Sequence, residues 1–227
     1  MLNYVEYGKE NKYDDDIFFQ KYSQMSRSQQ GLAGAGEWET LRKLLPDFKD
    51  KRVLDLGCGY GWHCIYAMEH GASSVVGVDI SHKMLEVAKE KTHFPQVEYK
   101  CCAIEDVEFP EESFDVILSS LAFHYVADYE ILVKKIYRIL KSGGKLVFTV
   151  EHPVFTAYGT QDWYYNEKGE ILHFPVDNYY YEGKRTAVFL GEKVTKFHRT
   201  LTTYLNTLLS NGFIINHIVE PQPPEYM

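Results

Sequence analysis

The chain has 227 residues with 45% hydrophobic residues and a formal net charge of −8. This length suits one α/β domain with a sizeable core and some additional segments. Because no block of basic residues occurs, we expect neither a nucleic-acid backbone nor an anionic membrane surface as the main partner. No apolar run approaches the roughly 20 residues that span a bilayer, and no signal-peptide pattern precedes the first acidic residues. We therefore expect a cytoplasmic protein without a membrane segment.

Residues 1–50 are predicted to form an N-terminal helical cap. Asp14–Asp16 favour the start of a helix, where the helix dipole stabilises negative charge. A glycine-rich break follows at 31–36, and a second helix is expected from Trp38 until Pro46 ends it. The cap therefore leads into the first strand through two short helices.

Residues 51–150 alternate between apolar runs and helical patterns, which predicts a parallel sheet with helices on both faces. The first strand, Arg52–Leu56, runs into glycines at three alternate positions, 57, 59 and 61. Glycine permits close approach of the backbone to a ligand at the start of the following helix. Further strands are expected at 74–78, 97–101, 115–119 and 145–150.

Two carboxylates indicate the type of cofactor. Asp79 ends the second strand, where an acidic residue can accept hydrogen bonds from ribose hydroxyls. Asp55 precedes the glycines and would oppose the pyrophosphate of a dinucleotide, whose usual third glycine is also missing. A cofactor without phosphate, carrying a sulfonium and an ammonium group, fits these residues better. S-adenosylmethionine has this structure.

The block Arg52–Val150 resembles the class I S-adenosylmethionine-dependent methyltransferases, especially their small-molecule branch. Asp55–Gly61 is similar to the first motif of that family and Gly77–Ser81 to the second. Phe109–Asp115 resembles the approach to the fourth strand, and Leu140–Gly144 resembles the turn before the fifth. The resemblance implies a Rossmann-like, doubly wound, mostly parallel sheet, with S-adenosylhomocysteine as the product of the cofactor.

The resemblance also implies contacts to the cofactor. Helices before the first strand of the family lie over the cofactor, so Tyr22 and Arg27 are candidates to bind its carboxylate. Ala103 stands where an adenine-binding aspartate is expected, which leaves the backbone of Ile104 and the carboxylate of Glu105 as alternatives. The full expected set is Tyr22, Arg27, Asp55, Gly57, Cys58, Gly59, Gly61, Asp79, Ile80, Met84, Ile104, Glu105 and Ser119.

Three histidines are candidate general bases. His124 follows the fourth strand, His152 follows the fifth, and His198 ends a predicted hairpin. An imidazole titrates near neutrality, and a hydroxyl, carbon or ammonium acceptor needs a base, whereas a neutral amine or a thiolate does not. Each histidine can equally be a structural residue. Four cysteines without Cys-x-x-Cys spacing are expected to be reduced, and we expect no metal site.

Residues 151–198 form an aromatic-rich insertion that is expected to roof the active site and to select the substrate. Its tyrosines can bind a substrate or surround an ammonium group, or they can form a small separate core. Residues 188–195 predict a hairpin with Gly191 first in a two-residue turn. In the last part, 199–227, a helix and a sixth strand at 213–219 are expected, but no seventh strand is evident.

The sequence thus predicts a single methyltransferase domain that transfers a methyl group to a small molecule. Two alternatives stay open: an RNA or protein substrate, and a non-enzymatic protein that binds S-adenosylmethionine. A dehydrogenase is a more distant third. Neither the identity of the methyl acceptor nor the oligomeric state follows from the sequence.

Overall fold

The computed structural model describes residues 9–222 and is built around a five-stranded sheet in the order β3-β2-β1-β4-β5. Every neighbouring pair of these strands is parallel. The strands are β1 (Arg52–Leu56), β2 (Ser74–Asp79), β3 (Val97–Cys101), β4 (Phe114–Ser120) and β5 (Leu140–Thr149). The prediction of a Rossmann-like parallel sheet is confirmed. Because the strand order reverses beside β1, a crevice is expected at the carboxyl ends of β1 and β4.

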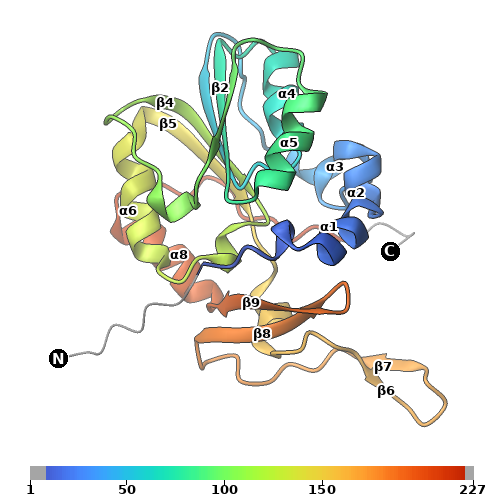
Figure 1. Ribbon diagram of the computed structural model, residues 1–227. Helices are drawn as coiled ribbons and strands as arrows, with labels where there is room; N and C mark the ends of the chain where they lie inside the picture. The colour runs from blue at the N-terminus through green and yellow to red at the C-terminus, as the bar shows by residue number, and fades with distance from the viewer. Residues whose placement is uncertain (1–8, 223–227) are drawn as a thin grey trace.

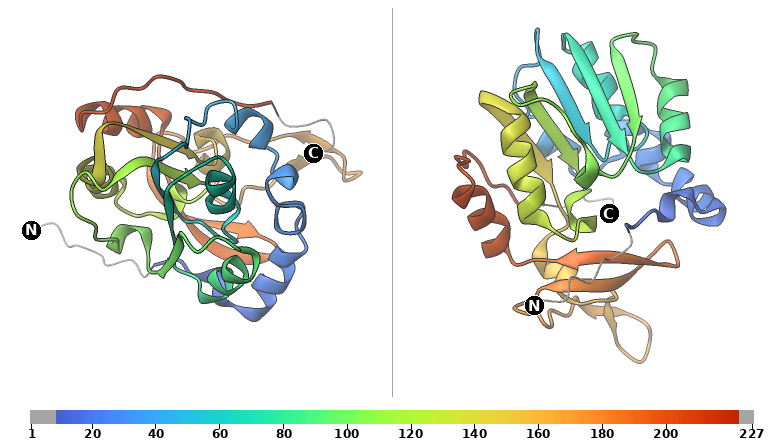
Figure 2. Two further views of the ribbon diagram at one scale, coloured as in Figure 1. Left: turned by 90° about the horizontal axis from the view of Figure 1, so that it is seen from above. Right: turned by 60° about the vertical axis from the view of Figure 1, so that its left-hand side comes forward.

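Helices cover both faces of the sheet (Figures 1 and 2). They include α4 (Trp62–Glu69), α5 (His82–Lys91), α6 (Tyr129–Ile139) and α8 (Leu201–Ser210). Alternate strand residues enter different cores: Leu54 packs in the core that contains α6 and α8, whereas Val53 packs in the core that contains α4. This alternation follows from the two-residue period of a strand. The three central strands, β1, β2 and β4, are therefore buried on both sides, which fixes their carboxyl ends in place.

The start of α5 shows how sequence sets a helix boundary. The Ser81 hydroxyl accepts a hydrogen bond from the Met84 amide at 3.1 Å, as the predicted N-cap requires. Asp14 adds a second contact, since its carboxylate accepts from the Ser81 hydroxyl at 2.6 Å and from the Lys83 amide at 3.1 Å. The N-terminal cap is thus attached directly to the helix that follows β2.

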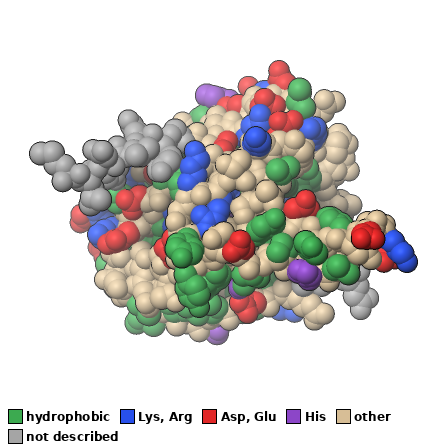
Figure 3. Space-filling model, turned by 90° about the horizontal axis from the view of Figure 1, so that it is seen from below, with side chains coloured by type: hydrophobic (Ala, Val, Ile, Leu, Met, Phe, Trp, Pro, Cys, Tyr) green, Lys and Arg blue, Asp and Glu red, His purple; other side chains and the backbone are tan. Residues whose placement is uncertain are grey.

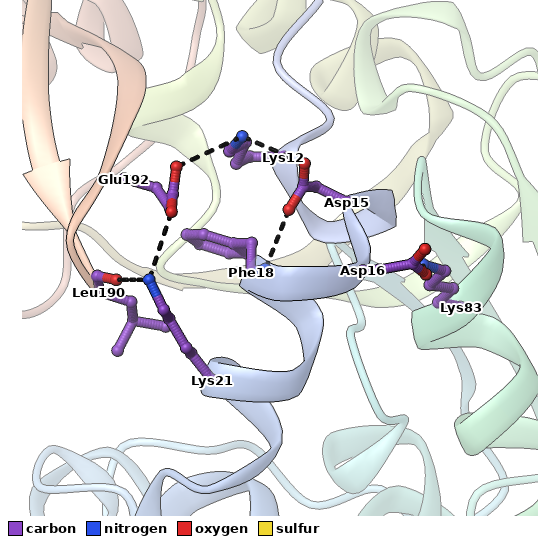
Figure 4. A network of polar contacts seen from close by, with 8 residues as sticks. All are labelled: Lys12, Asp15, Asp16, Phe18, Lys21, Lys83, Leu190 and Glu192. Atoms are coloured by element: carbon purple, nitrogen blue, oxygen red, sulfur yellow. Dashed lines mark hydrogen bonds and ion pairs between the residues drawn. The ribbon is translucent and has the colours of Figure 1, made fainter.

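The cap comprises η1 (Lys12–Asp14), α1 (Asp16–Ser23), α2 (Ser26–Gln29), η2 (Gly31–Gly34) and α3 (Trp38–Leu41). The predicted break at 31–36 is partly a 3-10 helix, and α3 ends earlier than the expected stop at Pro46. Figure 4 shows that α1 connects two parts of the molecule: Asp16 pairs with Lys83 of α5, and Lys21 reaches the opposite side. There its Nζ donates to Leu190 O at 3.0 Å.

The insertion contains α7 (Pro153–Ala157), β6 (Tyr164–Tyr165), β7 (Ile171–His173), β8 (Gly183–Phe189) and β9 (Glu192–His198). The β8–β9 hairpin lies below the carboxyl edge of the sheet, while β6–β7 projects away as an arm (Figure 1). Figure 3 shows hydrophobic side chains gathered along the underside of the insertion. The predicted turn is wrong in detail: Leu190 (φ 53°) and Gly191 (φ 78°) form it together, so glycine takes the second position.

Two strand predictions need correction. The fifth strand begins at Leu140, and its register shifts before Lys145, so the expected range covers only its second half. The expected sixth strand at 213–219 is wrong, because this segment forms no strand in the structure. Its residues alternate, with Phe213 and Ile215 packed on the core and Ile214 85% exposed, but a groove separates the segment from β5. The alternation of apolar and polar residues predicted a strand in this segment. A strand forms only if its backbone also comes within hydrogen-bonding distance of a sheet edge, here that of β5.

Candidate functional site: a crevice at the carboxyl edge of the sheet

A cavity lies at the carboxyl ends of β1, β2 and β4, between the N-terminal cap and the β8–β9 hairpin. The sheet supplies its floor through the turn after β1 and through Asp79 at the end of β2. The predicted cofactor residues that line it are Tyr22, Arg27, Gly57, Gly59, Asp79, Ile80, Met84, Ile104 and Glu105. The structure therefore brings together predicted residues from four separate parts of the chain.

The glycine turn has two different functions within a few residues. Gly57 (φ +77°) and Gly59 (φ +53°) line the cavity, and a Cβ at Gly59 would meet only Met84 Cε, at 3.3 Å. Gly61 (φ +75°) is outside the cavity wall, and a Cβ there would lie 2.1 Å from the Tyr99 hydroxyl. Gly61 is thus required for packing α4 against β3, whereas Gly59 leaves open space for a ligand.

Asp79 holds this turn in place. Its Oδ2 accepts a hydrogen bond from the Gly59 amide at 2.8 Å, and its Oδ1 accepts from the Ser81 amide at 2.9 Å. Burial raises the pKa of the Asp79 carboxyl, and these two amides act in the opposite direction. Each carboxylate oxygen has a further lone pair, so the side chain can still accept from a ligand hydroxyl in the cavity.

Asp55 lies behind the turn and does not line the cavity. It is 1% exposed, and its Oδ1 has no hydrogen-bond partner among residues 9–222, while Oδ2 receives only the Cys64 thiol at 3.5 Å. Burial raises the pKa of Asp55 to about 7. An unpartnered, buried carboxylate oxygen beside a glycine turn fits a cationic group, such as the ammonium end of S-adenosylmethionine.

The raised pKa of Asp55 predicts how the stability of the cofactor-free protein depends on pH. The folded protein holds this proton up to about pH 7, whereas the unfolded chain releases it near pH 4. Stability should therefore fall as pH rises between these values. Asp55→Asn should gain about 2.5 kcal/mol relative to the parent between pH 5 and pH 8. Urea unfolding at several pH values measures this difference, and parallel curves for the two proteins would contradict it.

The cap contributes Tyr22 and Arg27 to the cavity wall. One nitrogen of Arg27, Nη2, pairs with Glu37, which also accepts from the Ser120 hydroxyl at 3.2 Å. Tyr22 packs edge-on against Tyr60, with ring centroids 6.0 Å apart. The ion pair with Glu37 holds the Arg27 guanidinium at the cavity wall. Its other N–H groups can then bind an anionic group in the cavity.

Ile80, Met84, Ile104 and Glu105 lie together on the side of the cavity formed by β2, α5 and the segment after β3. Burial raises the pKa of Glu105. Cys58 and Ser119, also expected at the cofactor, are outside the lining, and the Ser119 hydroxyl donates to Leu56 O at 2.7 Å inside the sheet. In this structure Ser119 therefore joins β4 to β1.

Of the three candidate histidines, only His124 lines the cavity. His152 has a 42% exposed side chain, which caps α7 and pairs with Glu220. His198 is buried with both ring nitrogens engaged, by the Thr156 hydroxyl and by Tyr179 O, each at 2.8 Å. The expectation that His152 or His198 faces the reacting groups is therefore corrected: one is a surface cap and the other a structural hydrogen-bonded residue.

The sequence reasoning missed several residues on the His124 side of the cavity. The hydroxyls of Tyr13 and Tyr125 lie 3.3 Å apart, and burial raises the pKa of both. Glu151 and Phe189 come from the insertion, whose aromatic residues were expected to form the roof. Most of those aromatic residues are exposed on the arm and underside instead: Trp163, Tyr164, Tyr165, Tyr180 and Tyr181. A strand end directly before Glu151 was the available signal for it.

Comparison with known proteins agrees with this geometry. Residues 54–148 match a family described as a methyltransferase domain. A candidate S-adenosylmethionine-dependent methyltransferase of Listeria monocytogenes is 58% identical, with a TM-score of 0.80, over 83% of this chain and 88% of that one. This chain belongs to the class I S-adenosylmethionine-dependent methyltransferases. S-adenosylmethionine is therefore its cofactor.

Two further relatives extend over most of this methyltransferase. An S-adenosylmethionine-dependent methyltransferase of Mesorhizobium loti is 41% identical, with a TM-score of 0.79, over 86% of this chain and 89% of that one. An uncharacterized protein of Haemophilus influenzae is 36% identical over 92% of this chain and 85% of its own length. The similarity thus includes the cap and the insertion as well as the cofactor-binding core.

Residues 9–222 contain no candidate metal site, no candidate membrane-spanning helix and no disulfide bond. No group of His, Cys, Asp and Glu side chains there is arranged to hold a metal ion. The same part of the methyltransferase contains no helix with the length and apolar character needed to cross a bilayer. All four cysteines are free thiols.

Proposed function

We propose that this methyltransferase transfers the methyl group to a small molecule bound inside the cavity. The observation that carries the proposal is that the cap and the β8–β9 hairpin meet over the acceptor side. Phe18 of α1 packs with Ala187 and Val194 of the hairpin in one apolar cluster. An enclosed acceptor site suits a metabolite better than a polymer.

Polar contacts reinforce this roof at its rim. Glu192 of the hairpin pairs with Lys21 at 3.2 Å and with Lys12 at 3.7 Å (Figure 4). Glu10 accepts a hydrogen bond from the Thr195 amide at 2.5 Å. These contacts narrow the space available to an RNA strand or a protein segment on this side, and the net charge of −8 further opposes RNA.

We assign the cofactor contacts as follows. Gly57 and Gly59 allow close backbone approach, Asp79 binds the ribose, and Asp55 attracts the ammonium end from behind the turn, without lining the cavity. Tyr22 and Arg27 bind the carboxylate end, while Ile80, Met84, Ile104 and Glu105 contact the adenine side. When bound, S-adenosylmethionine supplies a methyl group on a sulfonium that is already a good leaving group. The protein then contributes mainly orientation of the acceptor and exclusion of water.

We also infer that residues 1–227 act as one methyltransferase domain, because the cofactor-binding core 51–150 has no closed site alone. The cap supplies Tyr13, Tyr22 and Arg27 to the cavity, and the insertion 151–198 supplies Glu151 and Phe189. On this view the roof selects the substrate.

A labelling experiment tests the function. The protein is incubated with methyl-labelled S-adenosylmethionine and a cell extract, and the label is followed in the metabolite, RNA and protein fractions. We expect label in the metabolite fraction, together with S-adenosylhomocysteine, and none with the Asp79→Ala variant. Label confined to RNA or protein would refute the small-molecule proposal. Binding without turnover would favour a cofactor-sensing protein.

A further inference from the structure

A buried ionic network lies beside the cavity and reaches its lining only through Glu151. Lys196 of β9 is 2% exposed, and its Nζ donates to Glu151 Oε1 at 2.5 Å and to Gln161 Oε1 at 2.8 Å. The Gln161 amide donates in turn to Glu151 Oε2 at 2.8 Å, which closes a three-residue ring. A buried ion pair usually adds little stability compared with apolar packing. Stability alone therefore does not explain why Lys196, Glu151 and Gln161 are arranged in this way.

The network fixes the peptide that faces His124. Glu151 follows β5 closely, and its backbone N–H points at Nδ1 of His124, with N and Nδ1 3.5 Å apart. A proton on Nδ1 would face that N–H directly, so this contact favours the neutral ring with its proton on Nε2. Nε2 has no partner among residues 9–222, and His124 lines the cavity. The ring is therefore oriented with a free N–H donor.

We propose that Lys196, Glu151 and Gln161 are positioning residues that hold His124 in its Nε2–H form, so that His124 donates a hydrogen bond to the methyl acceptor and does not remove its proton. This inference rests on the proposed function. It gives the insertion a second role, because Lys196 and Gln161 both belong to it. The insertion then covers the cavity and also determines the tautomer of His124, a residue of the cofactor-binding core.

The inference also indicates the class of acceptor. On this side of the cavity the charge of Glu151 is balanced by Lys196, and Glu10 accepts a hydrogen bond from the Thr195 amide. The other polar groups on this side can donate: His124 Nε2–H and the hydroxyls of the Tyr13–Tyr125 pair. We therefore infer an acceptor that presents a carbonyl or carboxylate oxygen to these donors. Its methylated atom is a neutral amine or a thiolate, which has a lone pair available without loss of a proton to His124.

The charges around His124 agree with a neutral ring. Burial lowers the pKa of His124 to about 4, with Lys196 and Arg199 acting in the same direction and Glu151 in the opposite one. Burial raises the pKa of Glu151, but His124, Lys196 and Gln161 together bring it below its usual value, so Glu151 stays charged and keeps Lys196 in place. The tautomer should thus not change across the neutral range.

Nitrogen NMR measures the tautomer without relying on activity. The full chain is labelled with 15N-histidine, and His124→Gln identifies the His124 ring signals in long-range 1H–15N spectra. From about pH 6 to 8 we expect the parent to show one neutral form with the proton on Nε2. Lys196→Met should shift both ring nitrogens toward a mixture of tautomers. Lys193→Met, which removes an exposed lysine from the same strand, should leave them unchanged.

The outcomes separate the two proposals. A proton on Nδ1, or a charged ring near pH 7, would overturn the inference whatever the substrate. Unchanged signals in Lys196→Met would refute the positioning role, and Gln161→Ala provides the same test if the lysine variant fails to fold. Label found only in RNA or protein, with the Nε2–H form present, would instead reject the small-molecule function and leave the His124 assignment intact.

Discussion

Asp79→Ala is expected to weaken S-adenosylmethionine binding by about 100-fold or more, as measured by calorimetry. The substitution removes the acceptor that we assign to the ribose. It also removes the partner of the Gly59 amide, so the turn beneath the cofactor loses its support. The variant loses both a charged acceptor and the support of the turn. We therefore expect a larger loss of cofactor affinity than from the replacement of any other single side chain in the cavity.

Asp115→Ala is the matched control for this variant. Asp115 also accepts a backbone hydrogen bond, from the Arg52 amide at 2.9 Å, and it pairs with Lys141 at 3.0 Å. Because it lies at the start of β4, at the opposite edge of the sheet, we expect a change in stability without a change in affinity. An Asp79→Ala protein that binds the cofactor as tightly as the parent would remove the ribose assignment.

Gly57→Ala is expected to destabilise the folded protein by about 3 kcal/mol or more. Gly57 has a φ of +77°, and a Cβ there would lie 2.5 Å from the Cβ of Ala122, in the loop after β4. Neither atom is the end of a flexible side chain, so the turn after β1 and the loop after β4 would have to separate. Chemical denaturation without cofactor gives the free energy of unfolding.

Gly143→Ala isolates the contribution of the backbone. Gly143 has nearly the same φ, +74°, but nothing lies within 4 Å of the Cβ position. We expect a cost of about 1 kcal/mol from the left-handed conformation alone. Equal losses in the two variants would mean that contact with Ala122 contributes nothing, and that the turn can move away from β4 without cost.

The cofactor half of the site could be predicted because its residues lie next to one another in the sequence. Gly57 and Gly59 follow β1 directly and Asp79 ends β2, so a strand pattern and the rule about carboxyl ends already place them together. Asp55 was expected to contact the cofactor from the same reasoning. The structure adds that its Oδ1 is buried without a partner, which no pattern of residues could show.

The part of the site that we expect to bind the methyl acceptor was harder to predict from local sequence patterns. His124 and His152 were favoured over His198 because both follow the carboxyl ends of predicted strands, but nothing in the sequence separates those two. The structure separates all three by the partners of their ring nitrogens: the Glu151 amide, Glu220, and the pair Thr156 and Tyr179. Those partners come from distant parts of the chain, so the role of each histidine depends on contacts that local patterns do not encode.

The sequence by itself determined the parallel sheet, the turn beneath the cofactor and the carboxylates beside it, because hydrophobic alternation, glycine and helix capping act over a few neighbouring residues. Only the tertiary structure decided how the cap meets the β8–β9 hairpin and which histidine faces the cavity. It also decided that 213–219 stays unpaired although its residues alternate as in a strand. These features depend on contacts between segments far apart in the chain, such as Lys196 with Glu151, whose energy exists only once the fold has brought them together.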